Sequence, residues 1–135
     1  MASKNILALD VGEKRIGVAV ADTSIRIAIP VTTLNVDGSE LSEIARLAAH
    51  ESTDTIVVGY PRNQSGEPTA QTAYVEAFAA QLTGIATVVF QDESLTSVMA
   101  EKRLASHNKP YAKADIDAQA ATIILQDYIE IHHAT

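Results

Sequence analysis

The chain contains no cysteine, which excludes disulfide bonds, thiolate metal sites and cysteine nucleophiles. It also contains no apolar run near the roughly 20 residues that a membrane-spanning helix requires. Its first five residues lead directly into an apolar stretch and lack the architecture of a signal peptide. We therefore expect a cytoplasmic protein.

Positive charge is scarce, because 10 Lys and Arg residues stand against 17 Asp and Glu residues, for a formal net charge of −7. A protein that only coats nucleic acid should be basic, since its affinity comes largely from neutralising phosphates. The acidity therefore counts against a simple nucleic-acid-binding module, and less against a nuclease, whose carboxylates hold cations. The 135 residues, 47% of them hydrophobic, fit one globular domain over residues 1–135.

The first long stretch, residues 5–22, predicts the centre of the fold. Two apolar runs, Ile6–Val11 and Ile16–Ala21, flank a short polar segment that contains Gly12, which is typical of a β-hairpin with glycine in its turn. Because both runs are almost continuously apolar, the hairpin should be central in its sheet and covered on both faces. Asp10 breaks this pattern, since a carboxylate inside such a strand is costly unless it is paired or binds a metal.

The rest of the chain alternates strands with helices. The order β-β-β-α-β-α-β-α-α predicts an α/β fold, a mixed sheet in which an antiparallel hairpin leads into parallel strands, with helices on both faces. The expected elements are an edge strand over Ile27–Leu34 that contains Pro30, a helix from the N-cap Ser39 through Ala48, a buried strand over Asp54–Gly59, a loop over Tyr60–Pro68, a helix over Thr69–Leu82 ended by Gly84, a strand over Ala86–Gln91, a helix over Ser97–Ser106 and a last helix over Asp115–His132.

Three acidic positions stand where ordinary packing would not place them. Asp10 lies in a buried strand, the Asp92–Glu93 pair follows another, and Asp117 heads the apolar stripe of the last helix. Each has a structural alternative. Asp10 could cap the hairpin turn, the Asp92–Glu93 pair could be solvated, and Asp117 could be a first-turn acid favoured by the helix dipole.

Together these acids describe carboxylates that converge on one face of the sheet, at the carboxyl ends of strands where ligands gather. Such a cluster needs cations to offset its repulsion at neutral pH. Oxygen ligands alone select hard ions, Mg²⁺ or Mn²⁺. Two such ions roughly 4 Å apart would activate a water and stabilise the leaving oxygen in phosphodiester hydrolysis.

Four segments of the chain form a further pattern: Leu9–Ala19, Ile56–Pro61, Asp92–Thr96, and Ile116–Asp117 with Ala120–Gln126. In order and spacing they resemble the motifs of the YqgF family. That family is described as Holliday junction resolvases of the ribonuclease H-like superfamily. The resemblance implies a ribonuclease H-like fold and a metal-dependent nuclease with Asp10, Glu93 and Asp117 as its catalytic and metal-binding acids. Its substrates would be the 5′ end of precursor 16S rRNA or, by analogy with bacterial junction resolvases, branched DNA.

The chain departs from the family pattern at two positions. Ser94 follows the Asp–Glu pair where the family usually has arginine, and Asp115 stands near a position that is often basic. A missing guanidinium would weaken the hold on a scissile phosphate more than the metal chemistry. The side chains that could still contact substrate are Lys14, Arg15, Arg62, Thr96, Lys109 and Lys113; for the basic ones scattered surface charge, and for Thr96 helix capping, is the alternative.

The prediction is thus a Mg²⁺- or Mn²⁺-dependent endonuclease acting on structured RNA or branched DNA as a monomer or homodimer, without a membrane partner. Two other interpretations compete with it. A nucleotide-phosphate binder would use the turn after Asp10, but that class needs two such domains and 135 residues supply one. A non-catalytic RNA- or protein-binding module would keep the fold, yet it has no reason to retain three repelling carboxylates.

Overall fold

The computed structural model describes residues 5–63, 65–93, 102, 105 and 113–132. Five strands form one sheet with the order β3-β2-β1-β4-β5. β1 pairs antiparallel with β2 and parallel with β4, β2 pairs antiparallel with β3, and β4 pairs parallel with β5. This is the predicted mixed sheet, with the hairpin at its centre. The strands are β1 (Asn5–Val11), β2 (Arg15–Asp22), β3 (Ala28–Asn35), β4 (Thr53–Pro61) and β5 (Thr87–Glu93).

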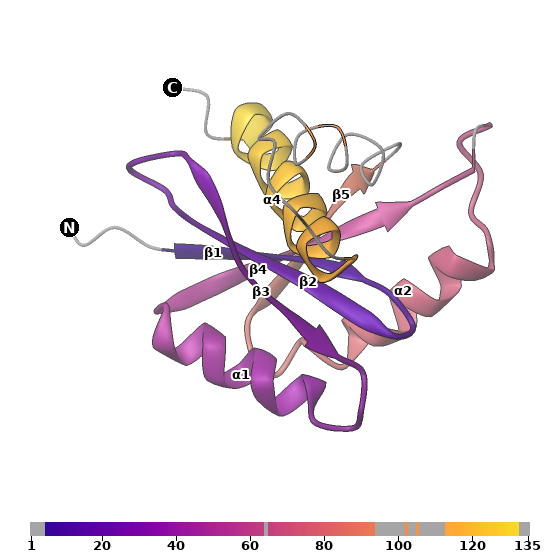
Figure 1. Cartoon of the computed structure of the whole chain (residues 1–135), viewed down its shortest axis with the longest axis horizontal. Helices are drawn as coiled ribbons and strands as arrows, with labels where there is room; N and C mark the ends of the chain where they lie inside the picture. Colours follow the sequence, from indigo (N-terminus) through magenta and orange to yellow (C-terminus); the bar gives the residue numbers. More distant parts are fainter. Residues whose placement is uncertain (1–4, 64, 94–101, 103–104, 106–112, 133–135) are drawn as a thin grey trace.

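Helices cover both faces of the sheet, as predicted (Figure 1). On one face α1 (Glu40–His50) and α2 (Ala70–Ala80) pack on one set of alternating strand side chains, such as Leu7 and Leu9 of β1. On the other face α4 (Lys113–His132) packs on the opposite set, which includes Ala8. Within the described residues no helix is long and apolar enough to cross a membrane.

The hairpin turn is closed by the backbone rather than by Asp10. The amide of Gly12 donates to the carbonyl of Arg15 at 2.9 Å, and the amide of Val36 donates to the carbonyl of Lys14, also at 2.9 Å. The edge position predicted from Pro30 is confirmed, because β3 is the outermost strand on this side and its pairing with β2 is irregular there. Proline lacks an amide donor, so an edge strand accommodates it best.

Three local predictions are corrected. Tyr60 and Pro61, expected in a loop, belong to β4 and pair with Asp92 and Glu93 of β5. The ladder between β1 and β4 already ends at Val58, so the donor that Pro61 lacks is not needed on that side. β5 consequently includes both acids.

The other two corrections concern the helix ends. Ser39 precedes α1, but its side chain makes no capping hydrogen bond; its hydroxyl donates to Asp37 at 2.5 Å instead. Gly84 does not end α2, which stops at Ala80 with Gln81 as its C-cap. The helix predicted over residues 97–106 falls almost entirely outside the described residues.

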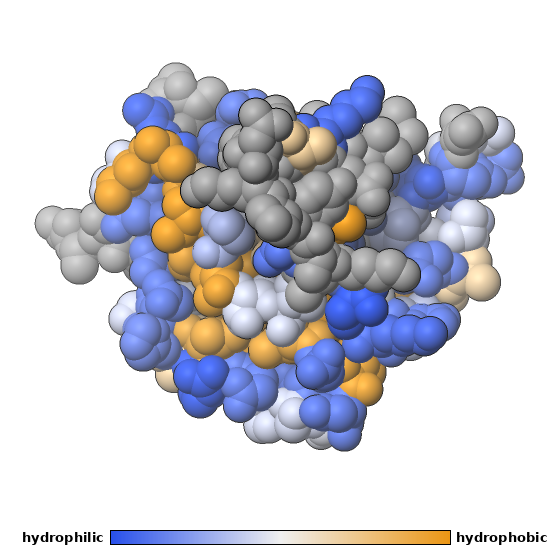
Figure 2. Space-filling view, viewed as in Figure 1, coloured by the Kyte–Doolittle hydropathy of each residue, from blue (hydrophilic) through white to orange (hydrophobic). Residues whose placement is uncertain are grey.

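Apolar side chains are exposed around the turn that joins β2 to β3. Ile25, Ile27 and Ile29 are more than half exposed and line a hollow of about 290 Å³ at the turn between β2 and β3. Figure 2 shows apolar residues gathered over this turn, at the left of the view. Gln126 of α4 fixes the end of this turn, because its side-chain oxygen accepts a hydrogen bond from the amide of Ala28 at 2.9 Å.

Candidate active site

Asp10 lies near the end of β1, opposite Gly17 of β2, and its side chain is half-buried. Strand alternation places it on the same face as Ala8, which packs under α4. Burial, and secondarily the charge of Asp117, raises the pKa of Asp10 to about 6. The carboxylate is therefore held in a site that disfavours its own ionised form.

Glu93 ends β5 and directs its carboxylate against Gly59 of β4. A Cβ at Gly59 would stand 2.0 Å from Oε2 of Glu93 and 2.6 Å from Cδ1 of Ile124, so only glycine leaves room for this carboxylate. Oε2 is buried and has no hydrogen-bond partner within the described part of the chain. Burial, followed by the charge of Asp10, raises the pKa of Glu93 to about 8.

Asp117 lies in the N-terminal part of α4 and is ion-paired. Nε of Arg15 donates to Oδ2 of Asp117 at 2.6 Å. The helix approaches β2 closely at this point, because a Cβ on Gly17 would stand 1.9 Å from the carbonyl oxygen of Asp117. The apolar stripe predicted beyond Asp117 is buried as expected, at Ala121 and Ile124 among others.

The three acids are electrostatic neighbours without forming a finished ligand set. The charge of Asp117 contributes to the raised pKa of Asp10, and the charge of Asp10 contributes to the raised pKa of Glu93. In residues 5–63, 65–93 and 113–132, however, no three acidic or histidine side chains stand close enough to hold one ion. A cation would neutralise the repulsion that contributes to the two raised pKa values. It would also give the buried oxygen of Glu93 the partner that it lacks among the described residues. The donors are all oxygens, so their chemistry suits a hard divalent ion, whereas the spacing of the described acids is wider than one ion requires.

The remaining predicted contact residues are spread over several surroundings. Lys14 is exposed and, with Arg15, Gln71 and Asp117, lines a hollow of about 350 Å³ next to the acids. Arg62 faces another hollow, where its Nε lies 3.3 Å from Oδ1 of Asp92. Ser94, Thr96 and Lys109 lie outside the described residues, as does the side chain of Lys113, which begins α4; Asp115 is exposed in the first turn of that helix.

Two features of the site were missed by sequence reasoning. One is the pairing of Arg15, a candidate for substrate contact, with Asp117; the substrate contact itself stays a prediction. The other is the space that Gly59 leaves for Glu93. A glycine inside an otherwise buried β-strand was the available signal, because such glycines mark close approaches to a strand.

The chain is similar to known proteins over nearly its whole length. Residues 4–131 fit the family profile of RuvX, described as a Holliday junction resolvase. A Chloroflexus aurantiacus protein named "Putative pre-16S rRNA nuclease" is 44% identical over 136 residues, covering 96% of this chain and 89% of that protein. A Dechloromonas aromatica protein of the same name is 39% identical, covering 95% and 92%.

Solved structures show the same fold at low sequence identity. RuvC of T. thermophilus, in complex with a Holliday junction substrate, has a TM-score of 0.56 at 13% identity and covers 95% of this chain and 94% of its own. Fowlpox virus resolvase with its substrate Holliday junction DNA has a TM-score of 0.56 at 11% identity, with coverages of 94% and 97%. The fold is ribonuclease H-like, and the profile match includes every described strand and helix except the last residue of α4, so the chain belongs to the RuvX family of Holliday junction resolvases.

Proposed function

We propose that this chain is a divalent-metal-dependent endonuclease that hydrolyses phosphodiester bonds in structured nucleic acid. The observation that carries the proposal is the buried oxygen of Glu93, which has no partner in the described residues and lies beside a second carboxyl of raised pKa. A purely structural protein gains nothing from such an arrangement, because a buried unpaired carboxylate costs stability.

Asp10, Glu93 and Asp117 would hold the ion, and their oxygen-only chemistry favours Mg²⁺ or Mn²⁺. When bound, such ions activate the attacking water and stabilise the leaving oxygen. Without them, Asp10 and Glu93 keep protons at neutral pH more readily than exposed carboxyls do, and Arg15 holds Asp117 in place. Lys14 lines the neighbouring hollow at the tip of the hairpin, where its positive charge would attract a substrate phosphate.

Precursor 16S rRNA is the first substrate to test, because the relatives at 39–44% identity carry that activity in their names. A four-way DNA junction is the second, since resolvases of this fold have been solved with such junctions. A two-fold symmetric junction would call for two active sites and hence a homodimer, whereas rRNA processing is compatible with a monomer. Action on ribosomal RNA would place the protein in the cytoplasm.

The test is cleavage of a precursor 16S rRNA 5′ segment and of a synthetic four-way DNA junction, each with Mg²⁺ or Mn²⁺. Asp10→Asn should abolish cleavage while the fold is kept. Glu130→Gln is the matched control, because it removes one exposed carboxylate of α4 away from the cluster, and it should cut like the parent. Absence of cleavage of both substrates by the parent protein would contradict the nuclease proposal and favour the non-catalytic binding module.

A further inference from the structure

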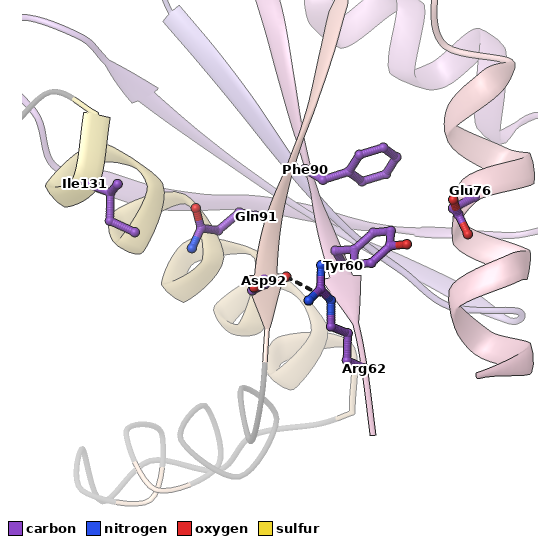
Figure 3. Close-up of a pocket in the computed structure, with 7 residues that line it drawn as sticks. All are labelled: Tyr60, Arg62, Glu76, Phe90, Gln91, Asp92 and Ile131. Carbon is purple, nitrogen blue, oxygen red and sulfur yellow. Dashed lines mark ion pairs between the residues drawn. The ribbon is translucent and has the colours of Figure 1, made fainter. Parts of the chain in front are cut away.

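A hollow of about 460 Å³ opens beside the edge strand β5, at its carboxyl-terminal half (Figure 3). Tyr60 of β4 and Phe90 of β5 form its aromatic side, and both project toward α2. Gln91 and Ile131 lie on the α4 side of the same strand. The hollow therefore reaches both sides of β5.

The two rings form a platform with an open surface. Their centroids are 5.1 Å apart and their planes are inclined by 67°, an edge-to-face arrangement that leaves ring area uncovered. Phe90 is 43% exposed although it is apolar and lies on an edge strand. Exposed apolar side chains on edge strands invite aggregation, so this one is better explained by a ligand that covers it.

Polar groups around the platform indicate what that ligand is. The guanidinium of Arg62 lies 5.0 Å from the ring centroid of Tyr60 and 3.3 Å from the carboxylate of Asp92. Among the described residues, Asp92 and Glu76 give the hollow two acidic side chains against one basic one, which disfavours a phosphate. Carboxylates instead accept hydrogen bonds from the amino groups of nucleobases, and aromatic and guanidinium planes stack on bases.

The platform adjoins the candidate active site. Phe90 precedes Glu93 by three residues, about 10 Å along a strand, and Tyr60 directly follows Gly59, which contacts the Glu93 carboxylate. Strand alternation directs Phe90 and Glu93 to opposite faces of β5. A nucleic-acid strand that crosses the carboxyl ends of β4 and β5 would pass from the aromatic platform on one face to Glu93 on the other. Because the two residues are only about 10 Å apart along the strand, this takes a few nucleotides.

We propose that Tyr60, Phe90 and Arg62 form a subsite that stacks one unpaired nucleobase of the substrate, a few nucleotides from the cleaved bond. This inference rests on the proposed nuclease function, which it deepens by selecting substrates with an unpaired nucleotide near the cut. Double-stranded nucleic acid without a displaced base leaves the platform empty. The amino groups of the stacked base face Asp92 and Glu76.

The test uses a short single-stranded RNA that carries one 2-aminopurine, a base whose fluorescence falls when it stacks, in the presence of a metal chelator so that no cleavage occurs. The parent protein should quench the fluorescence and bind this RNA about tenfold or more tightly than Phe90→Leu, which keeps an apolar side chain but removes the ring. Phe90→Tyr should restore quenching. Ile29→Ala is the control, because it trims a similarly exposed apolar side chain on the opposite edge strand and should quench like the parent.

The same RNA with an abasic site in place of 2-aminopurine separates base recognition from phosphate attraction, and the DNA versions of both probes show whether the sugar matters. The subsite is supported if the parent prefers the base-containing probe and Phe90→Leu removes that preference. It is overturned if the parent does not quench, or if Phe90→Leu quenches equally. Cleavage assays with Mg²⁺ or Mn²⁺ then separate the two proposals. Phe90-dependent quenching without any cleavage would retain the subsite and reject the nuclease, whereas cleavage with Phe90-independent quenching would do the reverse.

Discussion

Glu93 places its carboxylate in the space that Gly59 leaves open, and Arg15 neutralises Asp117 at the start of the last helix. The charge of Asp10 helps to raise the pKa of Glu93, and the charge of Asp117 helps to raise the pKa of Asp10. Single residues thus give the site an uneven charge balance, since one acid is paired and two resist ionisation. A bound cation would therefore stabilise the ionised forms of Asp10 and Glu93. To bind the same cation, Asp117 would have to give up its ion pair with Arg15.

Gly59→Ala tests the space for Glu93. The new methyl group would overlap Oε2 of Glu93 and Cδ1 of Ile124, so the carboxylate must move and we expect cleavage to fall at least about tenfold. Overpacking should also cost about 1–3 kcal/mol of unfolding free energy. Gly84→Ala is the matched control, because no atom of the described residues lies within 4 Å of its added methyl group; it should leave cleavage and thermal unfolding nearly unchanged. Equal activity of both variants would contradict the proposed position of Glu93.

Arg15 is expected to act by positioning Asp117. Arg15→Lys keeps a positive charge but loses the guanidinium geometry of the 2.6 Å contact, and Arg15→Gln loses the charge as well. If Arg15 competes with the ion for Asp117, Arg15→Gln should bind Mn²⁺ more tightly in calorimetric titration while it cleaves more slowly. If Arg15 serves only to bind substrate, the Arg15→Gln variant should bind Mn²⁺ with the affinity of the parent, and only its affinity for substrate should change.

At the scale of elements, the sequence predicts the strands and helices well because periodicity and composition are local. The continuous apolar runs identify β1 and β2 as central strands, and Pro30 identifies β3 as an edge strand. What the sequence leaves open depends on partners that are distant along the chain. The extension of β4 through Pro61 follows from its pairing with β5, and the side-chain direction of Arg15 follows from where α4 begins. A long flexible arginine can reach a phosphate or a carboxylate, and its position in the chain does not decide between them.

Helix capping gives a prediction at this scale. Thr69 accepts from the amide of Thr72 and Thr72 accepts from the amide of Thr69, a reciprocal capping box at the start of α2. Ser39 precedes α1 without any such bond. Thr69→Ala should therefore cost about 1 kcal/mol of unfolding free energy, whereas Ser39→Ala should cost less than about 0.5 kcal/mol. Denaturant titration of both variants measures this difference, and equal losses would show that the side-chain cap contributes nothing.

For the whole molecule, the acids at the centre of the fold link stability to pH and to metal. The acidic residues behind the formal net charge of −7 are spread over the whole chain, but the carboxyls of raised pKa belong to Asp10 near the end of β1 and Glu93 at the end of β5, on the face that α4 covers. Folding without an ion therefore brings ionisable groups together against their mutual repulsion. The net negative charge of the chain also repels nucleic acid, and bound cations would reduce that repulsion, so ion binding and substrate binding should be coupled.

We expect the metal-free protein to lose stability as the pH rises from about 5 to about 8. In the unfolded chain Asp and Glu lose their protons near pKa 3.8 and 4.5, whereas folded Asp10 and Glu93 retain theirs until about 6 and about 8. Between those values the folded state binds more protons than the unfolded state. The free energy of unfolding therefore falls with rising pH, by up to about 1.4 kcal/mol per pH unit for each group. Thermal unfolding in the presence of a chelator at several pH values measures the decline.

Asp10→Asn separates this effect from the general repulsion of an acidic chain. It removes one of the two carboxyls and the charge that helps raise the pKa of the other, so its stability relative to the parent should increase steadily from pH 5 to pH 8. Mn²⁺ should stabilise the parent, and more at pH 8 than at pH 5, because it binds the ionised carboxylates, while Asp10→Asn should gain much less. A parent stability that neither falls with pH nor responds to Mn²⁺ would mean that these acids form no cation site. The ribonuclease H-like fold would then be a scaffold, and its catalytic role would have to be abandoned.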